Sequence, residues 1–212
     1  MRGLFVTGTD TGVGKTVVAA ALLYRFHARY WKPIQTGIES DDDTAEVRRL
    51  TGKTDDRGEG VRLRNPVSPH LAAKQAGIQI EIETLTEWAA DSQEGWIVEG
   101  AGGVLVPVNE TQTMAALIVR LGLPVVVVAR TTLGTINHTL LTLEALRARS
   151  IRVAGVVMVG GPNSDNRAAI VRYGKTTVLG EMPHFDPLTP ARLAEWARTN
   201  LDPGSRLQEF FE

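Results

Sequence analysis

The sequence predicts an α/β fold, in which a mostly parallel β-sheet carries helices on both of its faces. Short apolar runs rich in β-branched residues alternate with longer segments of helical period along the 212 residues. The run "PVVVVA" (124–129) contains no polar residue, which is typical of a strand buried on both faces. Strands that alternate with helices run parallel, because each helix carries the chain back before the next strand begins.

The predicted elements follow one another along the chain in the same order. The predicted strands cover residues 3–7, 30–34, 95–100, 123–130, 152–160 and 176–183. The predicted helices cover residues 15–30, 42–52, 82–92, 113–122, 135–150 and 164–174. Gly52 marks the end of the second helix, since glycine readily takes the left-handed conformation found there.

Two segments have less regular patterns. Residues 53–70 are polar and rich in Gly and Pro. We expect them to form a long loop rather than a linker, because no new apolar core begins after them. Residues 204–212 end in two phenylalanines and predict a short final helix packed on a surface groove. The whole chain, residues 1–212, is therefore expected to form one domain.

Composition excludes several classes of function. Apolar residues make up 43% of the chain and charged residues 22%, as in soluble globular proteins. A net charge of −1 gives no general attraction to nucleic acid or to anionic membranes. The chain has no cysteine, which excludes disulfides, thiolate metal sites and cysteine nucleophiles. No apolar run approaches the roughly 18 residues of a membrane span, and the N-terminus lacks a signal-peptide core, so we expect a cytoplasmic protein.

The segment "GTDTGVGKT" (8–16) predicts a phosphate-binding loop. It joins a predicted strand to a predicted helix, and such glycine-rich turns direct several backbone N–H groups at an anion. Lys15 adds a positive charge, and the Thr16 hydroxyl is placed to bind Mg²⁺. The spacing is unusual, because five residues separate Gly8 from Gly14 and Thr9 stands where the first glycine is expected. The alternative is a crowded structural turn.

Carboxylates and a second lysine are expected beside this loop. Glu99 ends a predicted strand, and the C-terminal ends of parallel strands gather at the edge where ligands bind. Asp43 belongs to an acidic run, residues 41–43, that either holds a metal or only caps the next helix. Lys32 lies in an apolar strand and either faces a phosphate or extends to water. Glu99 could likewise only cap a nearby loop.

Three further turns follow predicted strands, at residues 99–103, 131–138 and 160–166. Helix N-termini in such turns bind carboxylates or phosphates, although most turns only reverse the chain. Together with the loop and the carboxylates, these turns give the set expected to bind nucleotide. Its members are Gly12, Val13, Gly14, Lys15, Thr16, Val17, Asp43, Glu99, Gly160 and Gly161.

These motifs, in their order, resemble the dethiobiotin synthetase family of biotin biosynthesis. The resemblance rests on "FVTGTDTGVGKT", "KPIQTG", "SPHLAA", "VEGAGGVLVP", "LPVVVVARTTLGTINHTLLT", "AGVV" and "LGEMP", and spans roughly residues 3–183. It implies a P-loop NTPase fold of about seven parallel strands and a homodimer. It also implies that ATP and Mg²⁺ drive the closure of a cyclic urea from 7,8-diaminononanoate (7,8-diaminopelargonate) and CO₂, through a carbamate and its phosphorylated anhydride.

The resemblance also implies roles for individual residues. Lys15 and Lys32 would flank the γ-phosphate and the carbamate, while Thr16, Asp43 and Glu99 would hold Mg²⁺. Thr11, counted with the two lysines as catalytic, would contact the diamine or carbamate. The implied substrate-binding residues are Thr36, Gly102, Gly103, Gly134, Thr135 and Asn137. The segment that contains Asn137 resembles the one that binds the substrate carboxylate from the partner subunit, so the substrate site is expected at the dimer interface.

The chain departs from the family pattern at two places. Gly12 stands where the family often has Glu, and the strand "AGVVMVGG" lacks the Asn that reads adenine near Val159 in known members. We therefore expect the base to be held through backbone groups of Gly160, Gly161 and the "GEMPHF" turn (180–185). This predicts weak discrimination among nucleoside triphosphates.

Two other classes of protein share parts of this pattern. Nucleotide-switched ATPases that bind partner proteins also have variant P-loops, but usually with a lysine early in the loop, where this chain has Asp10. Glutamine-dependent amidoligases with a related core normally need a cysteine nucleophile, which a partner chain would have to supply here.

Overall fold

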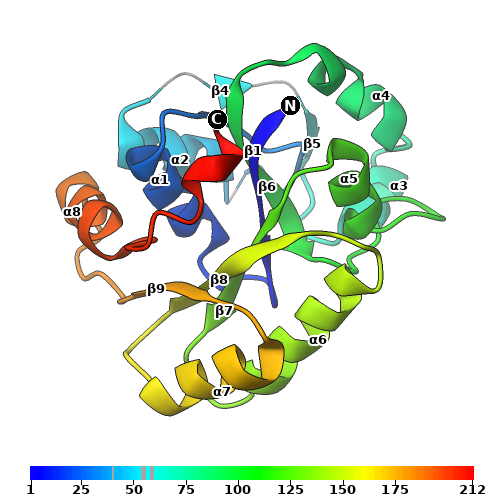
Figure 1. Ribbon diagram of the computed structural model, residues 1–212. Coiled ribbons are helices and arrows are strands. Elements are labelled where there is room, and N and C mark those ends of the chain that lie inside the picture. The colour runs from blue at the N-terminus through cyan, green and yellow to red at the C-terminus, as the bar shows by residue number, and fades with distance from the viewer. Residues whose placement is uncertain (40, 54–55, 58–59) are drawn as a thin grey trace.

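The computed structural model describes residues 1–39, 41–53, 56–57 and 60–212. Its main sheet has seven strands in the order β4-β2-β6-β1-β7-β8-β9, and every pair of neighbours is parallel. Two further strands, β3 and β5, form a separate parallel pair. Helices pack on both faces of the main sheet (Figure 1). The predicted fold class is confirmed.

The elements have the following bounds. The strands are β1 (Arg2–Gly8), β2 (Arg29–Trp31), β3 (Ile34–Thr36), β4 (Asp56–Arg57), β5 (Val61–Leu63), β6 (Gly95–Gly103), β7 (Val125–Arg130), β8 (Val153–Val159) and β9 (Val178–Met182). The α-helices are α1 (Lys15–Arg25), α2 (Asp43–Thr51), α3 (Pro69–Gln75), α4 (Ile82–Thr86), α5 (Met114–Leu121), α6 (Thr135–Arg147), α7 (Ser164–Gly174) and α8 (Pro190–Asn200). Two 3₁₀ turns are η1 (Glu87–Asp91) and η2 (Gln208–Phe210).

The central strands are buried on both faces, as their continuous apolar runs predict. On β1, Leu4 and Val6 pack with α1, α2 and α8, while Phe5 packs on the opposite face with α3 to α7. The side chains of β7 divide between the same two clusters in alternation. This two-sided burial fixes the strand edge at which the loops after β1, β6, β7 and β8 gather.

Helix α1 is shorter than the helix predicted over residues 15–30. Its buried face continues through Leu23, but Phe26 is extended at φ −125° and ψ 145° and ends the helix. Tyr30, where the predicted helix and the predicted strand overlap, is buried with Trp31 in β2, which pairs with β6 on one side and β4 on the other. Aromatic side chains pack well in a sheet of this kind, and at Tyr30 this tertiary pairing outweighs the helical period of the sequence.

The strand predicted over 30–34 and the loop predicted over 53–70 also need correction. Residues 29–36 form two strands, β2 and β3, in different sheets, with Pro33 between them. Proline has no N–H for a sheet ladder, so a break at this residue is favoured. The predicted loop contains β4, β5 and the first residues of α3, while the parts of it at 54–55 and 58–59 lie outside the described residues.

Two helices, α3 and α8, were not predicted, and the helix predicted over 82–92 is α4 followed by the 3₁₀ turn η1. Both unpredicted helices begin with proline, at Pro69 and Pro190, which is a favourable first helical residue. Thr189 caps α8 by accepting a hydrogen bond from the Arg192 N–H at 3.4 Å.

The C-terminal segment packs beside the N-terminus (Figure 1). Phe211 stacks on Phe26 with ring centroids 4.5 Å apart, and the Arg152 guanidinium lies 4.6 Å from the centre of the Phe210 ring. The predicted packing of both phenylalanines is confirmed, although the predicted final helix is only the 3₁₀ turn η2. Across the described part of the chain, no helix combines the length and apolarity needed to span a membrane.

Candidate active site

The loop between β1 and α1 has the backbone of a phosphate cradle. Gly12 and Gly14 have φ angles of +67° and +97°, in the left-handed region that favours glycine. A Cβ atom on Gly14 would lie 3.2 Å from the Val159 side chain, so the loop packs tightly against the end of β8. The Val13 side chain turns away from solvent and is buried. This conformation leaves the backbone amides that precede α1 free to face an anion.

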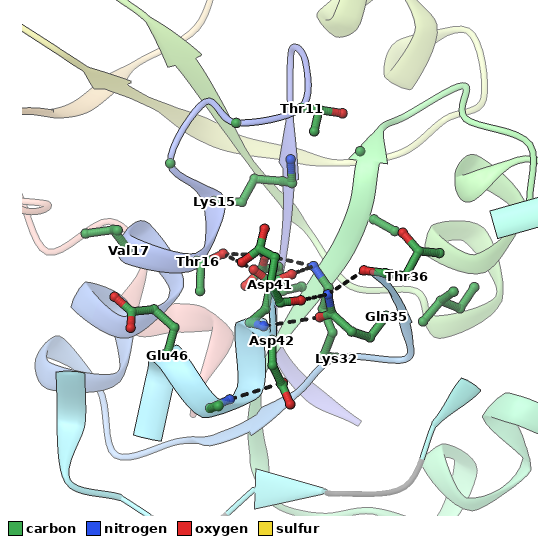
Figure 2. Close-up of a pocket in the computed structure, with 18 of the residues that line it drawn as sticks. Thr11, Lys15, Thr16, Val17, Lys32, Gln35, Thr36, Asp41, Asp42 and Glu46 are labelled. Carbon is green, nitrogen blue, oxygen red and sulfur yellow. Dashed lines mark hydrogen bonds and ion pairs between the residues drawn. The ribbon is translucent and has the colours of Figure 1, made fainter. Parts of the chain in front are cut away.

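Lys15, the first residue of α1, lies in the cavity next to this loop (Figure 2). Its ammonium donates a hydrogen bond to the backbone carbonyl of Asp10 at 3.1 Å. Burial lowers the pKa of Lys15, and the charge of Lys32 lowers it further. An anion placed in the cavity would therefore be a favourable partner for Lys15.

Lys32 stands at the centre of a buried polar cluster. Its ammonium lies 2.8 Å from a Glu99 oxygen and 2.5 Å from an Asp43 oxygen. The Thr16 hydroxyl donates to Asp43 at 2.5 Å and lies 3.1 Å from Glu99. The Tyr30 hydroxyl donates to the second oxygen of Glu99 at 2.9 Å. Thus β2, β6, α1 and α2 each contribute to one cluster at the edge of the sheet.

Burial and charge act in opposite directions within this cluster. Burial raises the pKa of Glu99, and the neighbouring Lys32 offsets only part of that effect. Burial would also raise the pKa of Asp43, but the charge and hydrogen bond of Lys32 outweigh it and the pKa is lowered. Burial disfavours the charged form of Lys32, yet the two carboxylates outweigh it and raise the pKa. Lys32 is therefore a buried cation whose charge depends on its acidic neighbours.

The cluster forms the floor of a cavity of about 650 Å³, here called the main cavity. Its lining residues are Thr11, Gly12, Gly14, Lys15, Thr16, Val17, Lys32, Ile34, Gln35, Thr36, Asp41, Asp42, Asp43, Ala45, Glu46, Arg49, Glu99, Ala101 and Gly102. Figure 2 shows Asp41 and Asp42 in the centre, with Lys15 above them, Thr16 to the left and Lys32 below. Most of the residues predicted to bind nucleotide or substrate are thus brought together in one cavity.

The other predicted residues lie around the main cavity. Gly103 lines a second cavity of about 420 Å³, together with residues 104–107 and the His138 side of α6. Val13 lines a third cavity of about 320 Å³, whose wall includes Val159, Met182 and His184. The main and third cavities share Gly12, Gly14 and Val17, so one ligand can occupy both.

Five predicted residues line none of these three cavities, namely Gly134, Thr135, Asn137, Gly160 and Gly161. Gly134 precedes α6 with φ +93°, and the Thr135 hydroxyl donates to the Arg130 carbonyl at 2.5 Å. Asn137 is exposed on the first turn of that helix. The Gly160 N–H is bonded to the Met182 carbonyl at 2.8 Å, which ties β8 to β9.

The oxygen donors in the cluster suit a magnesium ion. The Thr16 hydroxyl and the carboxylates of Asp43 and Glu99 are hard oxygen ligands, which Mg²⁺ prefers. Within the described ranges, no group of three or more His, Cys, Asp or Glu side chains is placed to hold a metal. A site with two carboxylates and a hydroxyl fits an ion that takes its other ligands from water and phosphate.

Several residues in or next to the cavities have no local signal for their role. Tyr30 lies where the predicted helix and strand overlap, and its hydroxyl donates to Glu99. Gln35 is buried and bonds to the acidic segment, although only its place in "KPIQTG" marks it. Arg130 donates to the Thr11 carbonyl at 3.0 Å from the end of β7. These contacts join residues far apart in the sequence, so only the folded chain reveals them.

Comparison with known proteins places this geometry in a family. Residues 2–192 match a family described as an AAA domain. The chain is 47% identical over 194 residues to the ATP-dependent dethiobiotin synthetase of Nitrobacter hamburgensis, with 91% of each chain covered. It is 48% identical to the enzyme of the same name from Paramagnetospirillum magneticum, over 92% of this chain and 94% of that one.

A solved structure extends the likeness of the fold. The ParA family ATPase of Chlorobium tepidum matches 99% of this chain and 96% of its own length, with a TM-score of 0.56 and 12% sequence identity. At that identity the likeness concerns the fold alone, and it confirms the P-loop NTPase architecture. The sequence identity over most of the chain carries the closer assignment: the chain belongs to the family of ATP-dependent dethiobiotin synthetases.

Proposed function

We propose that the protein converts 7,8-diaminononanoate, CO₂ and ATP into dethiobiotin, ADP and phosphate with the help of Mg²⁺. The observation that carries this proposal is the meeting of Lys15, Lys32, Thr16, Asp43 and Glu99 in the main cavity. Relatives that match nearly the whole chain are named ATP-dependent dethiobiotin synthetase, a ligase in biotin biosynthesis. The main cavity has the charges that such a phosphoryl transfer needs.

The triphosphate would lie along the loop of residues 12–17. Backbone N–H groups at the start of α1 would receive the phosphates, and Lys15 would neutralise the outermost one. Thr16, Asp43 and Glu99 would hold Mg²⁺, which would supply positive charge against the phosphate oxygens. Lys32, held by both carboxylates, lines the same cavity as Lys15 and would share its positive charge with the transferring phosphoryl group.

The nucleotide base would extend from the loop into the third cavity. Val13, Val159, Met182 and Phe185 give this cavity an apolar wall. An apolar wall binds the faces of all bases and reads their edges poorly. Gly160, Gly161 and the turn that follows β9 would add backbone contacts at the far end.

The reaction would run in three steps, each of which needs charge and alignment more than a strong base. One amine of the diamine adds to CO₂ and loses a proton, which gives a carbamate. A carbamate oxygen then takes the γ-phosphoryl group and ADP leaves. The second amine attacks the carbamate carbon, the C–O bond to the phosphate breaks, and the ring closes with release of phosphate and a proton. Thr11 and Thr36 would orient the carbamate between Lys15 and Lys32.

The substrate would lie at the interface of a homodimer. The second cavity opens beside Gly102 and Gly103, and its rim carries the exposed apolar side chains of Leu105 and Leu141. Leu133 is fully exposed just before α6. A second copy would cover these side chains and bring its own Gly134, Thr135 and Asn137 to the substrate carboxylate. We place the enzyme in the cytoplasm, with no nucleic acid or membrane partner.

The nucleotide-switched ATPases share the fold but lack support in the loop. Asp10 stands where those proteins usually have a lysine, and its carboxylate accepts a hydrogen bond from the Thr11 N–H at 2.7 Å. The Arg130 guanidinium lies 3.5 Å from the same carboxylate. Asp10 is thus used inside its own loop, which favours the synthetase.

One assay tests the proposal. The protein is incubated with 7,8-diaminononanoate, bicarbonate, Mg²⁺ and ATP, and the cyclic urea is detected by mass. We expect equal amounts of cyclic urea, ADP and phosphate, and no cyclic urea with the Lys15→Ala variant, because the outer phosphate loses its counter-charge. Phosphate release that is independent of the diamine, or equal turnover by the variant, would contradict the proposal.

A further inference from the structure

The separate pair of strands β3 and β5 lies outside the main sheet, and side chains of both strands bond to the acidic segment that leads into α2. The two strands are parallel, with Gln35 opposite Arg62 in the register. Residues that are paired in this way point to the same face of a sheet. From that face, both side chains bond to residues 41–43. The family roles described above use neither side chain.

Gln35 is a buried amide whose hydrogen bonds go mainly to the acidic segment. Its NH₂ group donates to the Asp41 carbonyl at 2.9 Å and to the Thr36 carbonyl at 3.0 Å. Its oxygen accepts a bond from the Asp43 N–H at 3.3 Å. Only 4% of the residue is exposed to solvent, so these bonds are shielded from competition by water. Figure 2 shows Gln35 next to this segment on the floor of the main cavity.

Arg62 restrains the same segment from the side. Its guanidinium lies 2.5 Å from one oxygen of Asp42. The other oxygen of Asp42 accepts bonds from the Thr44 and Ala45 N–H groups at 3.1 and 3.2 Å, which caps α2. The helix therefore starts at a fixed place, and Asp43 is its first residue. Its carboxylate then reaches both Thr16 and Lys32.

We propose that Gln35 and Arg62 are positioning residues that together hold Asp43 where it binds the metal of the nucleotide. Both side chains act on the residues around the Asp43 carboxylate. Gln35 bonds to the backbone of Asp41 and Asp43, and Arg62 pairs with Asp42, which caps α2. Groups that orient a metal ligand in this way typically contribute about 10- to 100-fold to metal affinity or activity. The inference rests on the proposed function, because it takes Asp43 as a metal ligand.

The test measures how strongly Mg²⁺ tightens ADP binding. The dissociation constant of ADP is determined by calorimetry with saturating Mg²⁺ and again in EDTA. The ratio of the EDTA value to the Mg²⁺ value gives the factor by which the metal tightens ADP binding. In Gln35→Met, which removes the amide at similar volume, the ratio should fall about tenfold while the EDTA value stays unchanged. The control variant Gln75→Met makes the same change at the exposed end of α3 and should alter neither value.

A variant of Asp43 distinguishes a failure of the proposed metal site from a failure of the positioning role. If Asp43→Asn leaves the ratio unchanged, the proposed metal site itself is wrong. If Asp43→Asn lowers it but Gln35→Met does not, the metal site stands and the positioning role is overturned. An equal loss of ADP affinity with and without Mg²⁺ in Gln35→Met would also overturn it, because that result would indicate general damage to the cavity.

Arg62→Met provides a second route to the answer. The side chain of Arg62 is partly exposed, so its loss should leave the fold intact, as circular dichroism would verify. We expect the ratio to fall about threefold in this variant, a smaller loss because the cap on α2 remains. If Gln35→Met does not fold, Arg62→Met alone tests the positioning role. An unchanged ratio in Arg62→Met would overturn the joint role of Gln35 and Arg62.

Discussion

Lys32 is buried and contacts both carboxylates of the site, Asp43 and Glu99. Its positive charge is also available to a phosphate in the main cavity. In the described structure its ammonium also donates to the Gly100 carbonyl at 3.1 Å. Those contacts hold it at the floor of the main cavity before any ligand arrives. A charge fixed in this way stabilises a transition state without reorganising, which is the largest contribution in many enzymes.

We therefore expect Lys32→Ala to lower kcat far more than it weakens ATP binding. Loss of one fixed charge typically lowers kcat about 10²- to 10³-fold, whereas the phosphate loop and Lys15 still bind the nucleotide. Steady-state kinetics and equilibrium binding of ATP measure the two quantities. The exposed Lys74→Ala serves as a control for charge. Equal losses in kcat and in ATP affinity would mean that Lys32 acts in ground-state binding.

Val159 should make the enzyme tolerant of the nucleotide base. Its side chain lines the third cavity and contacts the phosphate loop near Gly14. A valine cannot hydrogen bond to a base edge, and sites that lack such bonds discriminate weakly. Turnover with CTP, GTP and UTP should lie within about tenfold of turnover with ATP. A strong and exclusive preference for ATP would show that backbone groups alone read adenine.

Among the elements, the turn from β1 into α1 needs a glycine backbone at the candidate phosphate site. Gly14→Ala would force an L-residue to φ +97° and place a methyl group 3.2 Å from Val159. The left-handed conformation costs about 1–2 kcal/mol in a residue with a side chain. We expect ATP affinity to fall at least tenfold, because strain in the loop moves the amides that face the phosphates.

The matched control for this variant is Gly122→Ala at the end of α5. Gly122 has φ +67°, and a Cβ there would meet no atom within 4 Å. Both variants should lose thermal stability, but only Gly14→Ala should lose ATP affinity in a binding titration. If both variants bind ATP as the parent chain does, the glycine is needed for folding and not for the cradle.

At the same scale, the sequence predicts the elements whose signals are local. The strand "GLFVT", the glycine-rich turn and the continuous apolar run of β7 each contain their own information, and each lies where expected. The segment from residue 26 to residue 36 does not. Its helical period continues past Phe26 and overlaps the predicted strand at Tyr30, and only the folded chain shows that the helix ends at Phe26 while residues 29–31 pair with β6.

The active-site residues divide in the same way. Lys15, Thr16 and Lys32 lie in motifs, and the structure places all three in the main cavity with Asp43 and Glu99. Gln35 lies in the motif "KPIQTG", but nothing local links it to Arg62, because that pairing depends on the register of two strands that meet only in the folded chain. Their contacts come from tertiary packing, which a single sequence does not encode at short range.

For the molecule as a whole, we propose that two copies of the chain form the complete substrate site. Asn137 is exposed and lines none of the main, second and third cavities. The residue that follows it on α6, His138, lines the second cavity. A partner subunit that covers Leu133 and Leu141 would bring its own α6 to the substrate. The carboxylate of the diamine would then bind at the first turn of that helix.

This arrangement predicts complementation between variants. Asn137→Ala should raise the KM for the diamine and barely alter ATP affinity, while Asn200→Ala, an exposed change on α8, should alter neither. Mixing Asn137→Ala chains with inactive Lys15→Ala chains should restore about a quarter of the parent activity at low diamine, because half of the dimers then hold one intact site. No gain on mixing, in dimers shown to exchange subunits, would place both residues in sites made by one chain.

In the proposed reaction, the main cavity transfers the γ-phosphoryl group of ATP to a carbamate made from CO₂. The sharpest test supplies freshly dissolved CO₂ labelled with ¹⁸O and measures the mass of the phosphate after a brief reaction. We predict that each phosphate carries one labelled oxygen, because the C–O bond of the mixed anhydride breaks as the ring closes. Phosphate free of the label, formed together with dethiobiotin, would contradict the account.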